Sequence, residues 1–355
     1  MTSPLHPDQM TPAWLSNTLA ASGFQDSAVA AFSTTRIGTG QTGACARVHL
    51  RYQSANADGP DTLVAKFASD SELSRESAVA MGIYRRELEF YRDVAPGLNM
   101  RLPRCYALEI DARGAQFLIL MDDLAPAEPG DQLAGCSVAV ARQAVLELVG
   151  LQSATWCDAT LGERFKEPED GFFSDMHGLY NQMLPAFVER FGPRLAADEL
   201  AIIEQLGDSP RAPLFSALGT PFCLEHRDYR LDNFLIDNRA AEPKVAIVDW
   251  QGMRTGRPLN DVVLCLAGGL ASAERRQHEQ AILRDYHSGL LAAGVKDFDW
   301  EQCWREYRRA SFAGFGLTVV ASIAVEQTTR GDDMFTAMAQ RHARHALDLN
   351  AAEFL

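Results

Sequence analysis

The character of the sequence changes at Met121, and this change restricts the possible fold more than any other feature. Short stretches of alternating or apolar residues, typical of β-strands, precede it. They are Arg47–Tyr52, Thr62–Phe67, Cys105–Ile110 and Ala115–Met121. Beyond a polar segment that contains two prolines, most of the chain has the apolar periodicity of helices. We therefore predict an α+β fold with a small strand-rich lobe over 1–121, a linker over 122–132 and a larger helical lobe over 133–355.

The same periodicity predicts individual elements within these lobes. The predicted helices are Pro12–Ser22, Glu72–Val94, Ser137–Ser153, Asp175–Leu206 and Phe312–Val325. A hairpin is predicted between Pro221 and Trp250, where three short apolar stretches lie close together in the sequence. The longest apolar stretch, Phe312–Val325, has 14 residues, which is too few to span a bilayer and indicates a buried helix.

Composition restricts the partners and the compartment. The chain has 355 residues with 33 Lys and Arg against 47 Asp and Glu, a formal net charge of −14. Because nucleic acids and anionic membranes repel such a chain, we expect it to bind neither. Its seven cysteines are scattered and odd in number, which favours a reducing compartment over a disulfide framework. The first residues have no secretory signal pattern, so we expect a cytoplasmic protein.

The strongest motif is HRDYRLDN, which begins at His226 and matches the HRDxxxxN pattern of kinase catalytic loops at every fixed position. A carboxylate at Asp228 can accept the proton of a hydroxyl group that attacks a phosphoryl group. The amide oxygen of Asn233 suits Mg²⁺. His226 is expected to shape the loop rather than to react. We predict Asp228 as the catalytic base and Asn233 as a metal ligand.

Asp249 follows the apolar stretch VAIV, 16 residues after Asn233. A carboxylate at the end of a buried strand needs a partner, and a metal ion bound to phosphates is a suitable one. The position corresponds to the aspartate of the kinase DFG motif. Here the motif is Asp-Trp-Gln, which leaves the metal role possible and argues against regulation by a flip of this segment. We predict Asp249 as a metal ligand.

A glycine-rich segment, GTGQTG, lies between two strand-like stretches in the first lobe. A dinucleotide-binding loop of this pattern would lead directly into a helix, whereas VHLRY has strand character. A loop that covers the phosphates of a nucleotide fits better. We predict that Gly38, Gly40 and Gly43 bind the cofactor, although the motif alone is as typical of an ordinary turn.

Lys66 lies within LVAKF, which is close to the VAIK pattern of kinases. Such a lysine can neutralise the phosphates of a nucleotide if a carboxylate holds it. Glu87 is the candidate, because Tyr84, Glu87 and Tyr91 follow each other at spacings of 3 and 4 and so share one helical face. We predict that Lys66 and Glu87 form an ion pair at the nucleotide site.

The segment LEHRDYRLDNFLIDN together with VAIVDWQ resembles the aminoglycoside phosphotransferase/choline kinase-like superfamily, and the resemblance covers nearly the whole chain. It implies a protein-kinase-like fold, ATP between the lobes, Mg²⁺ sites, and transfer of the γ-phosphate to a hydroxyl group of a small molecule. Two positions depart from the pattern. Arg227 stands where a glycine is expected, and Gln152 where these families often have a histidine.

Two alternative functions remain open. A pseudokinase would bind a nucleotide without turnover, but the candidate residues Lys66, Asp228, Asn233 and Asp249 are all present. A protein kinase would need a longer segment after Asp249 to bind a peptide. The acceptor is open too, although the apolar character of 312–325 favours a bulky, largely apolar alcohol over an aminoglycoside. Arg230 is predicted to stabilise the transferring phosphoryl group, because kinases of the HRDLKxxN type have a lysine there; pairing with Asp232 is the alternative.

Overall fold

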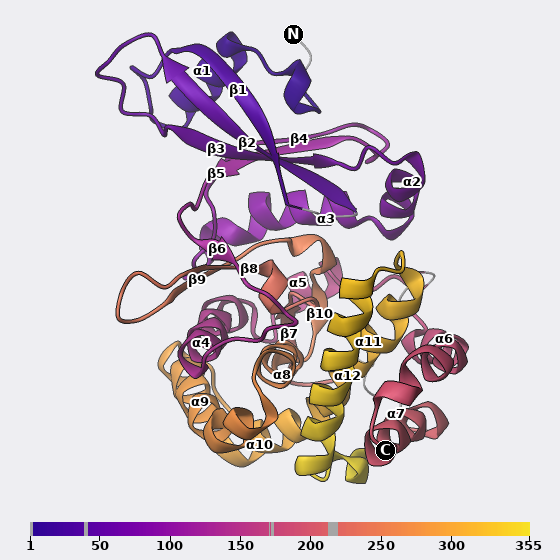
Figure 1. Cartoon of the computed structure of the whole chain (residues 1–355). Coiled ribbons are helices and arrows are strands. Elements are labelled where there is room, and N and C mark those ends of the chain that lie inside the picture. Colours follow the sequence, from indigo (N-terminus) through magenta and orange to yellow (C-terminus); the bar gives the residue numbers. More distant parts are fainter. Residues whose placement is uncertain (1–2, 39–41, 170, 172–173, 212–218) are drawn as a thin grey trace. The chain divides into compact units, whose positions relative to one another are not determined.

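The computed structural model describes residues 3–38, 42–169, 171, 174–211 and 219–355. It divides into two compact units, which we call the small unit and the large unit (Figure 1). The small unit consists of Met1–Gly97, Leu102–Pro126 and Asp249–Gly252. The large unit consists of Leu98–Arg101, Ala127–Val248 and Met253–Leu355. The segment Asp249–Gly252 thus belongs to the small unit, although it lies far from the rest of that unit in the sequence.

An antiparallel sheet of five strands, in the order β1-β2-β3-β5-β4, forms the centre of the small unit (Figure 1). Its strands are β1 (Val29–Ile37), β2 (Gly43–Tyr52), β3 (Thr62–Ala68), β4 (Cys105–Ile110) and β5 (Phe117–Asp122). Helix α1 (Pro12–Ala21) begins where Thr11 Oγ1 accepts a hydrogen bond from the Trp14 backbone N–H. Its Leu15 and Leu19 pack into the same apolar core as Val48 and Leu120 of the sheet. This burial fixes the face and register of the strands.

The predicted helix over 72–94 is wrong as a single helix. It consists of α2 (Glu72–Met81), α3 (Ile83–Glu89) and a π-helical turn, η2 (Phe90–Val94). Gly82 separates α2 from α3, because its left-handed backbone, with φ of 65°, ends the first helix. The predicted inward face is confirmed, since Tyr84, Glu87 and Tyr91 are all buried.

The large unit is mainly helical. Its helices are α4 (Val138–Thr155), α5 (Ala159–Arg164), α6 (Met176–Phe191), α7 (Ala197–Asp208), α8 (Pro258–Gly269), α9 (Ser272–Ala292), α10 (Trp300–Arg309), α11 (Ala313–Ala324) and α12 (Thr329–Asp348). Helix α8 is the central one, because every residue in it except Asn260 is buried. It packs against α4, α9, α10, α11 and α12.

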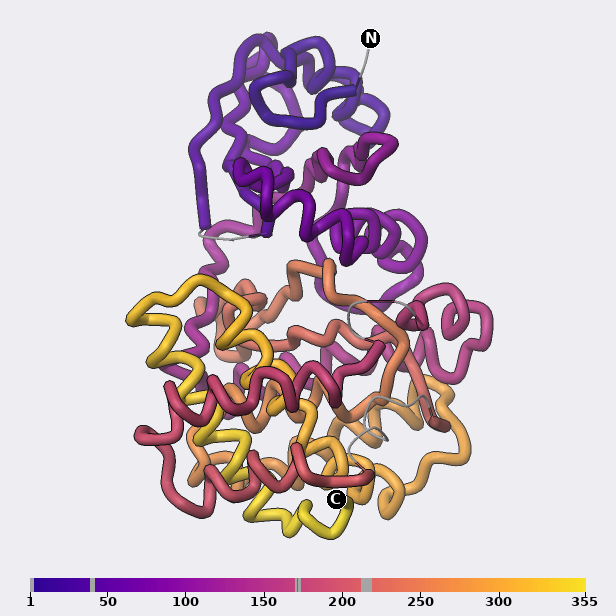
Figure 2. Tube along the Cα trace, turned by 90° about the vertical axis from the view of Figure 1, so that its right-hand side faces the viewer, coloured from indigo at the N-terminus to yellow at the C-terminus, as the bar shows by residue number. Residues whose placement is uncertain are grey.

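The predicted helix over 175–206 is also divided, into α6 and α7. A short 3-10 turn, η4 (Gly192–Arg194), connects them, and Pro193 within it cannot continue the hydrogen bonding of an α-helix. The two helices therefore run side by side as a roughly antiparallel pair (Figure 2).

The strands of the region predicted to hold one hairpin take part in three strand pairings. The hairpin itself is formed by β8 (Phe234–Asp237) and β9 (Lys244–Ile247). Strand β7 (Cys223–Glu225) instead pairs with β10 (Arg254–Gly256), which follows the hairpin in the sequence. A short strand within the predicted linker, β6 (Glu128–Pro129), joins the edge of β8. The HRDYRLDN segment therefore directly follows β7 and directly precedes β8, so a paired strand holds each of its ends.

The apolar stretch 312–325 forms the end of a 3-10 turn, η8 (Ala310–Phe312), and then α11. Phe315 and Val319 belong to the core that α11 shares with α6, α7 and α12. A Cβ atom at Gly314 would lie 2.3 Å from the His342 ring, so this glycine permits close helix packing. Among the described residues, no helix combines the length and apolar character that crossing a membrane requires.

His342 makes the stability of the large unit sensitive to acid. Burial, together with Arg341 and Arg275, lowers its pKa to about 3, whereas an unfolded chain has a histidine pKa of about 6.5. Between these values the unfolded state binds more protons, so the free energy of unfolding should fall as the pH falls below 6.5. At pH 5 this histidine alone should lower it by about 2 kcal/mol. Denaturant titrations at pH 7.5 and pH 5 measure the loss.

The matched variants are His342→Gln and His49→Gln, since His49 is exposed on β2. Between pH 7.5 and pH 5, the free energy of unfolding of His342→Gln should fall by less than that of the wild type. That of His49→Gln should fall by as much as that of the wild type. Equal losses in all three proteins would contradict the assignment.

Candidate active site

The loop that carries Asp228 leaves β7 and returns through the 3-10 turn η6 (Leu231–Asn233) into β8. The carboxylate of Asp228 accepts hydrogen bonds from Arg230 Nε at 2.7 Å and from Asn233 Nδ2 at 2.8 Å, and its side chain is 32% exposed. Burial opposes ionisation, but Arg230, His226 and Asn233 together hold the pKa of Asp228 below its usual range. The carboxylate is therefore ionised at neutral pH and oriented by two donors, as a proton acceptor must be.

Asp261 anchors the start of this loop and is not among the site residues predicted from the sequence. Its carboxylate accepts hydrogen bonds from the backbone N–H groups of His226 at 2.7 Å and Arg227 at 2.9 Å. His226 Nδ1 accepts from the backbone N–H of Asp228, and its Nε2 donates to the carbonyl of Val248. His226 thus shapes the loop, as the sequence predicts. The signal in the sequence was that Asp261 is the one charged residue in the mostly apolar stretch PLNDVVLCLAGG, and the structure shows it fully buried there.

Arg227 has a left-handed backbone, with φ of 69°. This conformation is costly for a residue with a side chain and free for glycine, which explains why a glycine is expected at this position. Asp249 is left-handed too, with φ of 68°. Such strain is typical of residues whose orientation serves a function.

Gln132, at the end of the predicted linker, supports the middle of the loop and is a second residue that the sequence analysis missed. Its Oε1 accepts a hydrogen bond from the Leu231 backbone N–H at 2.8 Å. Its own backbone N–H donates to Asp232 Oδ1 at 3.0 Å. Gln132 is fully buried, so these bonds fix the turn η6, which carries Asn233 and follows Asp228 in the loop.

Arg230 pairs with carboxylates on both sides in the sequence. Its Nε lies 2.7 Å from Asp228 Oδ1 and its Nη1 lies 2.6 Å from Asp232 Oδ2. The predicted alternative, a contact with Asp232, is therefore present. The guanidinium group of Arg230 also contacts Asp228, the candidate base. Replacing Arg230 would therefore change the surroundings of Asp228 as well.

In the small unit, Lys66 of β3 forms the predicted ion pair with Glu87 of α3. The distance from Lys66 Nζ to Glu87 Oε2 is 2.6 Å, and Nζ also lies 2.9 Å from Asp249 Oδ1. Burial opposes the charge on Lys66, but the carboxylates of Asp249 and Glu87 outweigh it and raise the pKa of this lysine. Glu87 further accepts a hydrogen bond from the Trp250 backbone N–H. These three predicted site residues therefore form one cluster.

Trp250 explains why the motif is Asp-Trp-Gln. Its ring stacks on Phe90 with ring centroids 3.8 Å apart, and this attaches the turn η7 (Trp250–Gly252) to the end of α3. Gln251 exchanges hydrogen bonds with the Thr42 hydroxyl at the end of the glycine-rich segment. The segment that carries Asp249 is therefore packed in place from two sides within the small unit.

The structure describes the glycine-rich segment only in part. Gly38 has a left-handed backbone with φ of 71°, and Gly43 begins β2, where an added Cβ would lie 3.6 Å from the Lys66 side chain. Gly40 lies outside the described residues. The Tyr84 hydroxyl donates to the carbonyl of Thr42, which ties the end of this segment to α3.

Each unit offers oxygen atoms of the kind that hard divalent cations bind. In the small unit Asp249 offers carboxylate oxygens, and in the large unit Asn233, whose amide nitrogen donates to Asp228, offers its amide oxygen. Across the described part of the chain, no group of three or more His, Cys, Asp or Glu residues is arranged to hold a metal ion. Either oxygen donor suits Mg²⁺, which takes most of its ligands from phosphate oxygens and water.

The Lys66–Glu87 pair should be energetically coupled. Because both side chains are buried, Lys66→Met leaves the Glu87 carboxylate without its cation, and Glu87→Gln leaves Lys66 with Asp249 alone. The two losses together should therefore exceed the loss in the double variant. In a double-mutant cycle of Lys66→Met and Glu87→Gln, we expect a coupling of at least about 1 kcal/mol in the free energy of unfolding. Denaturant titration measures it.

The exposed pair of Arg36 and Asp70, 3.2 Å apart in the same unit, is the matched control and should couple by much less. Additive effects of Lys66→Met and Glu87→Gln would show that the buried contact carries no coupling.

Comparison with known proteins identifies the family. The model of the ecdysteroid kinase-like family matches residues 38–296, which is most of the 355-residue chain. Among curated proteins, none matches the chain.

Solved structures with a similar fold have low sequence identity. A microcompartment-associated aminopropanol kinase has a TM-score of 0.57 and 12% identity, over 96% of this chain and 99% of its own. A candidate aminoglycoside phosphotransferase from Ralstonia eutropha JMP134 has a TM-score of 0.53 and 16% identity, over 94% and 98%. The wild-type aminoglycoside 2'-phosphotransferase-IIIa, solved with GDP, has a TM-score of 0.53 and 12% identity, over 96% of this chain and 100% of its own.

These likenesses show the fold, a kinase-like α+β fold with a small strand-rich lobe and a larger helical lobe, as the sequence predicts. The match of the family model extends from the glycine-rich segment through Lys66, Asp228 and Asp249 to the end of α9 and beyond. The chain therefore belongs to the ecdysteroid kinase-like family.

Proposed function

We propose that this protein transfers the γ-phosphate of ATP, as its Mg²⁺ complex, to a hydroxyl group of a small molecule, with Asp228 as the base. The observation that carries the proposal is the environment of Asp228. Its carboxylate is ionised, partly exposed, and held by Arg230 and Asn233 on a loop that Asp261 anchors. This arrangement suits a group that accepts a proton from an attacking hydroxyl.

Each remaining site residue has a role in this reaction. Lys66, kept charged by Glu87 and Asp249, would bind phosphate oxygens of the nucleotide. Asp249 and Asn233 would hold Mg²⁺, which neutralises charge on the phosphates when bound. Gly38, Gly40 and Gly43 would let the backbone of their segment approach the phosphates. A pseudokinase would have no need of an oriented carboxylate at Asp228.

The acceptor is proposed as an alcohol. The family is named for ecdysteroid kinases, and similar folds belong to an aminopropanol kinase and an aminoglycoside phosphotransferase. The apolar stretch 312–325 does not help to choose among them, because Phe315 and Val319 are core residues. The acceptor must therefore be found by screening.

A coupled assay of ADP release with Mg-ATP tests the proposal. The panel contains an ecdysteroid, aminopropanol, an aminoglycoside and other hydroxylated metabolites, and each acceptor is assayed with the wild type and with Asp228→Asn. We expect one acceptor class to stimulate ADP release by the wild type only. Stimulation of both proteins to the same extent would remove Asp228 from the chemistry.

Arg230 is proposed to stabilise the transferring phosphoryl group, in which a guanidinium can contact two oxygens at once. Arg230→Ala should then lower kcat and kcat/KM together and leave the KM for ATP nearly unchanged. Because Arg230 also holds the pKa of Asp228 down, its loss should raise that pKa and move the acid limb of the kcat/KM profile to higher pH. A variant with normal turnover and only a lower melting temperature would make the role of Arg230 structural.

A further inference from the structure

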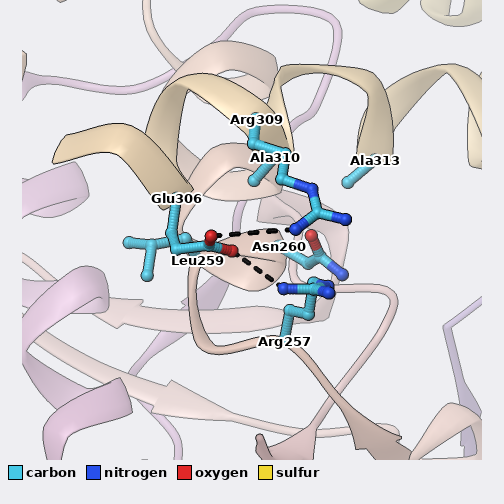
Figure 3. Close-up of a pocket in the computed structure, with 7 residues that line it drawn as sticks. All are labelled: Arg257, Leu259, Asn260, Glu306, Arg309, Ala310 and Ala313. Atoms are coloured by element: carbon cyan, nitrogen blue, oxygen red, sulfur yellow. Dashed lines mark hydrogen bonds and ion pairs between the residues drawn. The ribbon is translucent and has the colours of Figure 1, made fainter. Parts of the chain in front are cut away.

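A small cavity lies in the large unit, where the start of α8 meets α10, η8 and the start of α11 (Figure 3). Its lining residues are Arg257, Leu259, Asn260, Glu306, Arg309, Ala310 and Ala313. The cavity has a volume of about 30 Å³, which is enough for roughly two water molecules. None of these residues has a role in the reaction proposed above.

Two guanidinium groups pair with the same carboxylate at the cavity. Arg257 Nη1 lies 2.9 Å from Glu306 Oε2, and Arg309 Nη1 lies 3.8 Å from Glu306 Oε1. Figure 3 shows both groups on the same side of Glu306, with the Asn260 amide between them. Burial and the nearby charge of Arg257 lower the pKa of Arg309. A negative group in the cavity would relieve this repulsion.

One donor in this cluster is unused within the described part of the chain. The Nε atom of Arg257 is buried and has no hydrogen-bond partner there. Leaving such a donor unpaired is costly unless a ligand or water satisfies it. Two guanidinium groups and an amide are the donors that proteins use to bind planar carboxylates.

The size of the cavity selects among anions. A carboxylate places two oxygens in the space of roughly two water molecules, whereas a tetrahedral phosphate needs more room. Leu259, Ala310 and Ala313 add an apolar wall that suits the carbon chain behind a carboxylate. We propose that this cavity binds the carboxylate group of a small organic acid.

The cavity is connected to the candidate catalytic loop through Glu225. This buried carboxylate accepts hydrogen bonds from the Arg257 backbone N–H and, at 2.8 Å, from Asn260 Nδ2. Glu225 directly precedes His226, and Asp261, the next residue after Asn260, holds the loop itself. A carboxylate bound between Arg257 and Arg309 would therefore affect the position of Asp228 through Glu225 and Asp261. Binding of the carboxylate does not require the enzyme to turn over.

Titration calorimetry with acetate tests the binding site. The wild type should give a saturable heat, and Arg309→Gln should weaken the affinity about tenfold or more. Arg305→Gln is the matched control, because Arg305 is exposed on the same helix and does not line the cavity. The charge of Arg305 acts on Arg309 less than that of Arg257 does, so the affinity of this variant for acetate should stay close to that of the wild type. Ala313→Val, which fills the cavity and keeps every charge, should also abolish binding.

The absence of saturable acetate binding to the wild type would overturn the proposal. An equal loss of acetate affinity in Arg309→Gln and Arg305→Gln would overturn it too, since acetate would then be attracted to positive charge in general and not to this cavity. Tighter binding of inorganic phosphate than of acetate would contradict the choice of a carboxylate. Because the titration needs no acceptor or ATP, its outcome is independent of the proposed phosphotransferase activity.

Kinetics then separate two sources of the carboxylate. If it belongs to the acceptor, acetate should compete with the acceptor, and Arg309→Gln should raise the KM for the acceptor with the KM for ATP unchanged. If it belongs to a separate metabolite, acetate should change kcat in the wild type and in Arg305→Gln, and not in Arg309→Gln.

Discussion

Asp228→Asn is expected to fold, to bind Mg-ATP with nearly wild-type affinity, and to lose kcat by about 10²–10⁴-fold. The amide is of the same size as the carboxylate, and its one oxygen can accept a hydrogen bond from either Arg230 or Asn233, which donate to different oxygens of Asp228. Asn233 also donates to the backbone carbonyl of residue 228, so the loop should keep its shape. It cannot accept the proton of the attacking hydroxyl. Steady-state kinetics with the acceptor found by screening measure kcat, and calorimetry measures nucleotide affinity.

Asp285→Asn serves as the control for this variant, because Asp285 makes an exposed ion pair with Arg142 in the same unit. It should retain normal kcat. If Asp228→Asn kept more than about a tenth of the wild-type kcat, Asp228 would not be the base.

Asp249→Ala should have the second large effect, a loss of turnover of about 10²-fold or more, because a bound metal ion contributes several kcal/mol to the stabilisation of charge in the transition state. The wild type should bind ATP much more weakly in EDTA than with Mg²⁺, and the variant should lose most of that difference. Calorimetric titration of ATP under both conditions measures it. Lys66 keeps its pair with Glu87 in this variant, so the fold of the small unit should survive.

The control for this effect is Asp70→Ala, which removes an exposed carboxylate of the small unit. Its response to Mg²⁺ should be that of the wild type. Equal ATP affinity of the wild type with Mg²⁺ and in EDTA would contradict the metal role of Asp249, as would normal turnover of Asp249→Ala.

Local patterns predicted those parts of the fold that depend on local physics. The alternation in Arg47–Tyr52 gave a strand because one face of β2 packs into the core. The spacing of Tyr84, Glu87 and Tyr91 identified a buried helical face and hence the partner of Lys66. In these cases the deciding contacts follow from periodicity alone.

The missed features depend on contacts between distant segments. Asp261 binds backbone N–H groups 35 and 34 residues away, and Gln132 binds one 99 residues away. The pairing of β7 with β10 likewise skips the intervening hairpin. Gly82, which divides α2 from α3, was visible in the sequence, but its left-handed backbone depends on the packing on either side. Periodicity carries no information on such contacts.

Transfer of label from γ-³²P-ATP tests the central claim most directly. The wild type, with Mg²⁺ and the acceptor panel, should produce a labelled organic phosphate, and Asp228→Asn should produce almost none. Label only in inorganic phosphate would indicate an ATPase, and label on protein would indicate a protein kinase. Either result, or equal organic label with both proteins, would contradict a small-molecule phosphotransferase that uses Asp228 as its base.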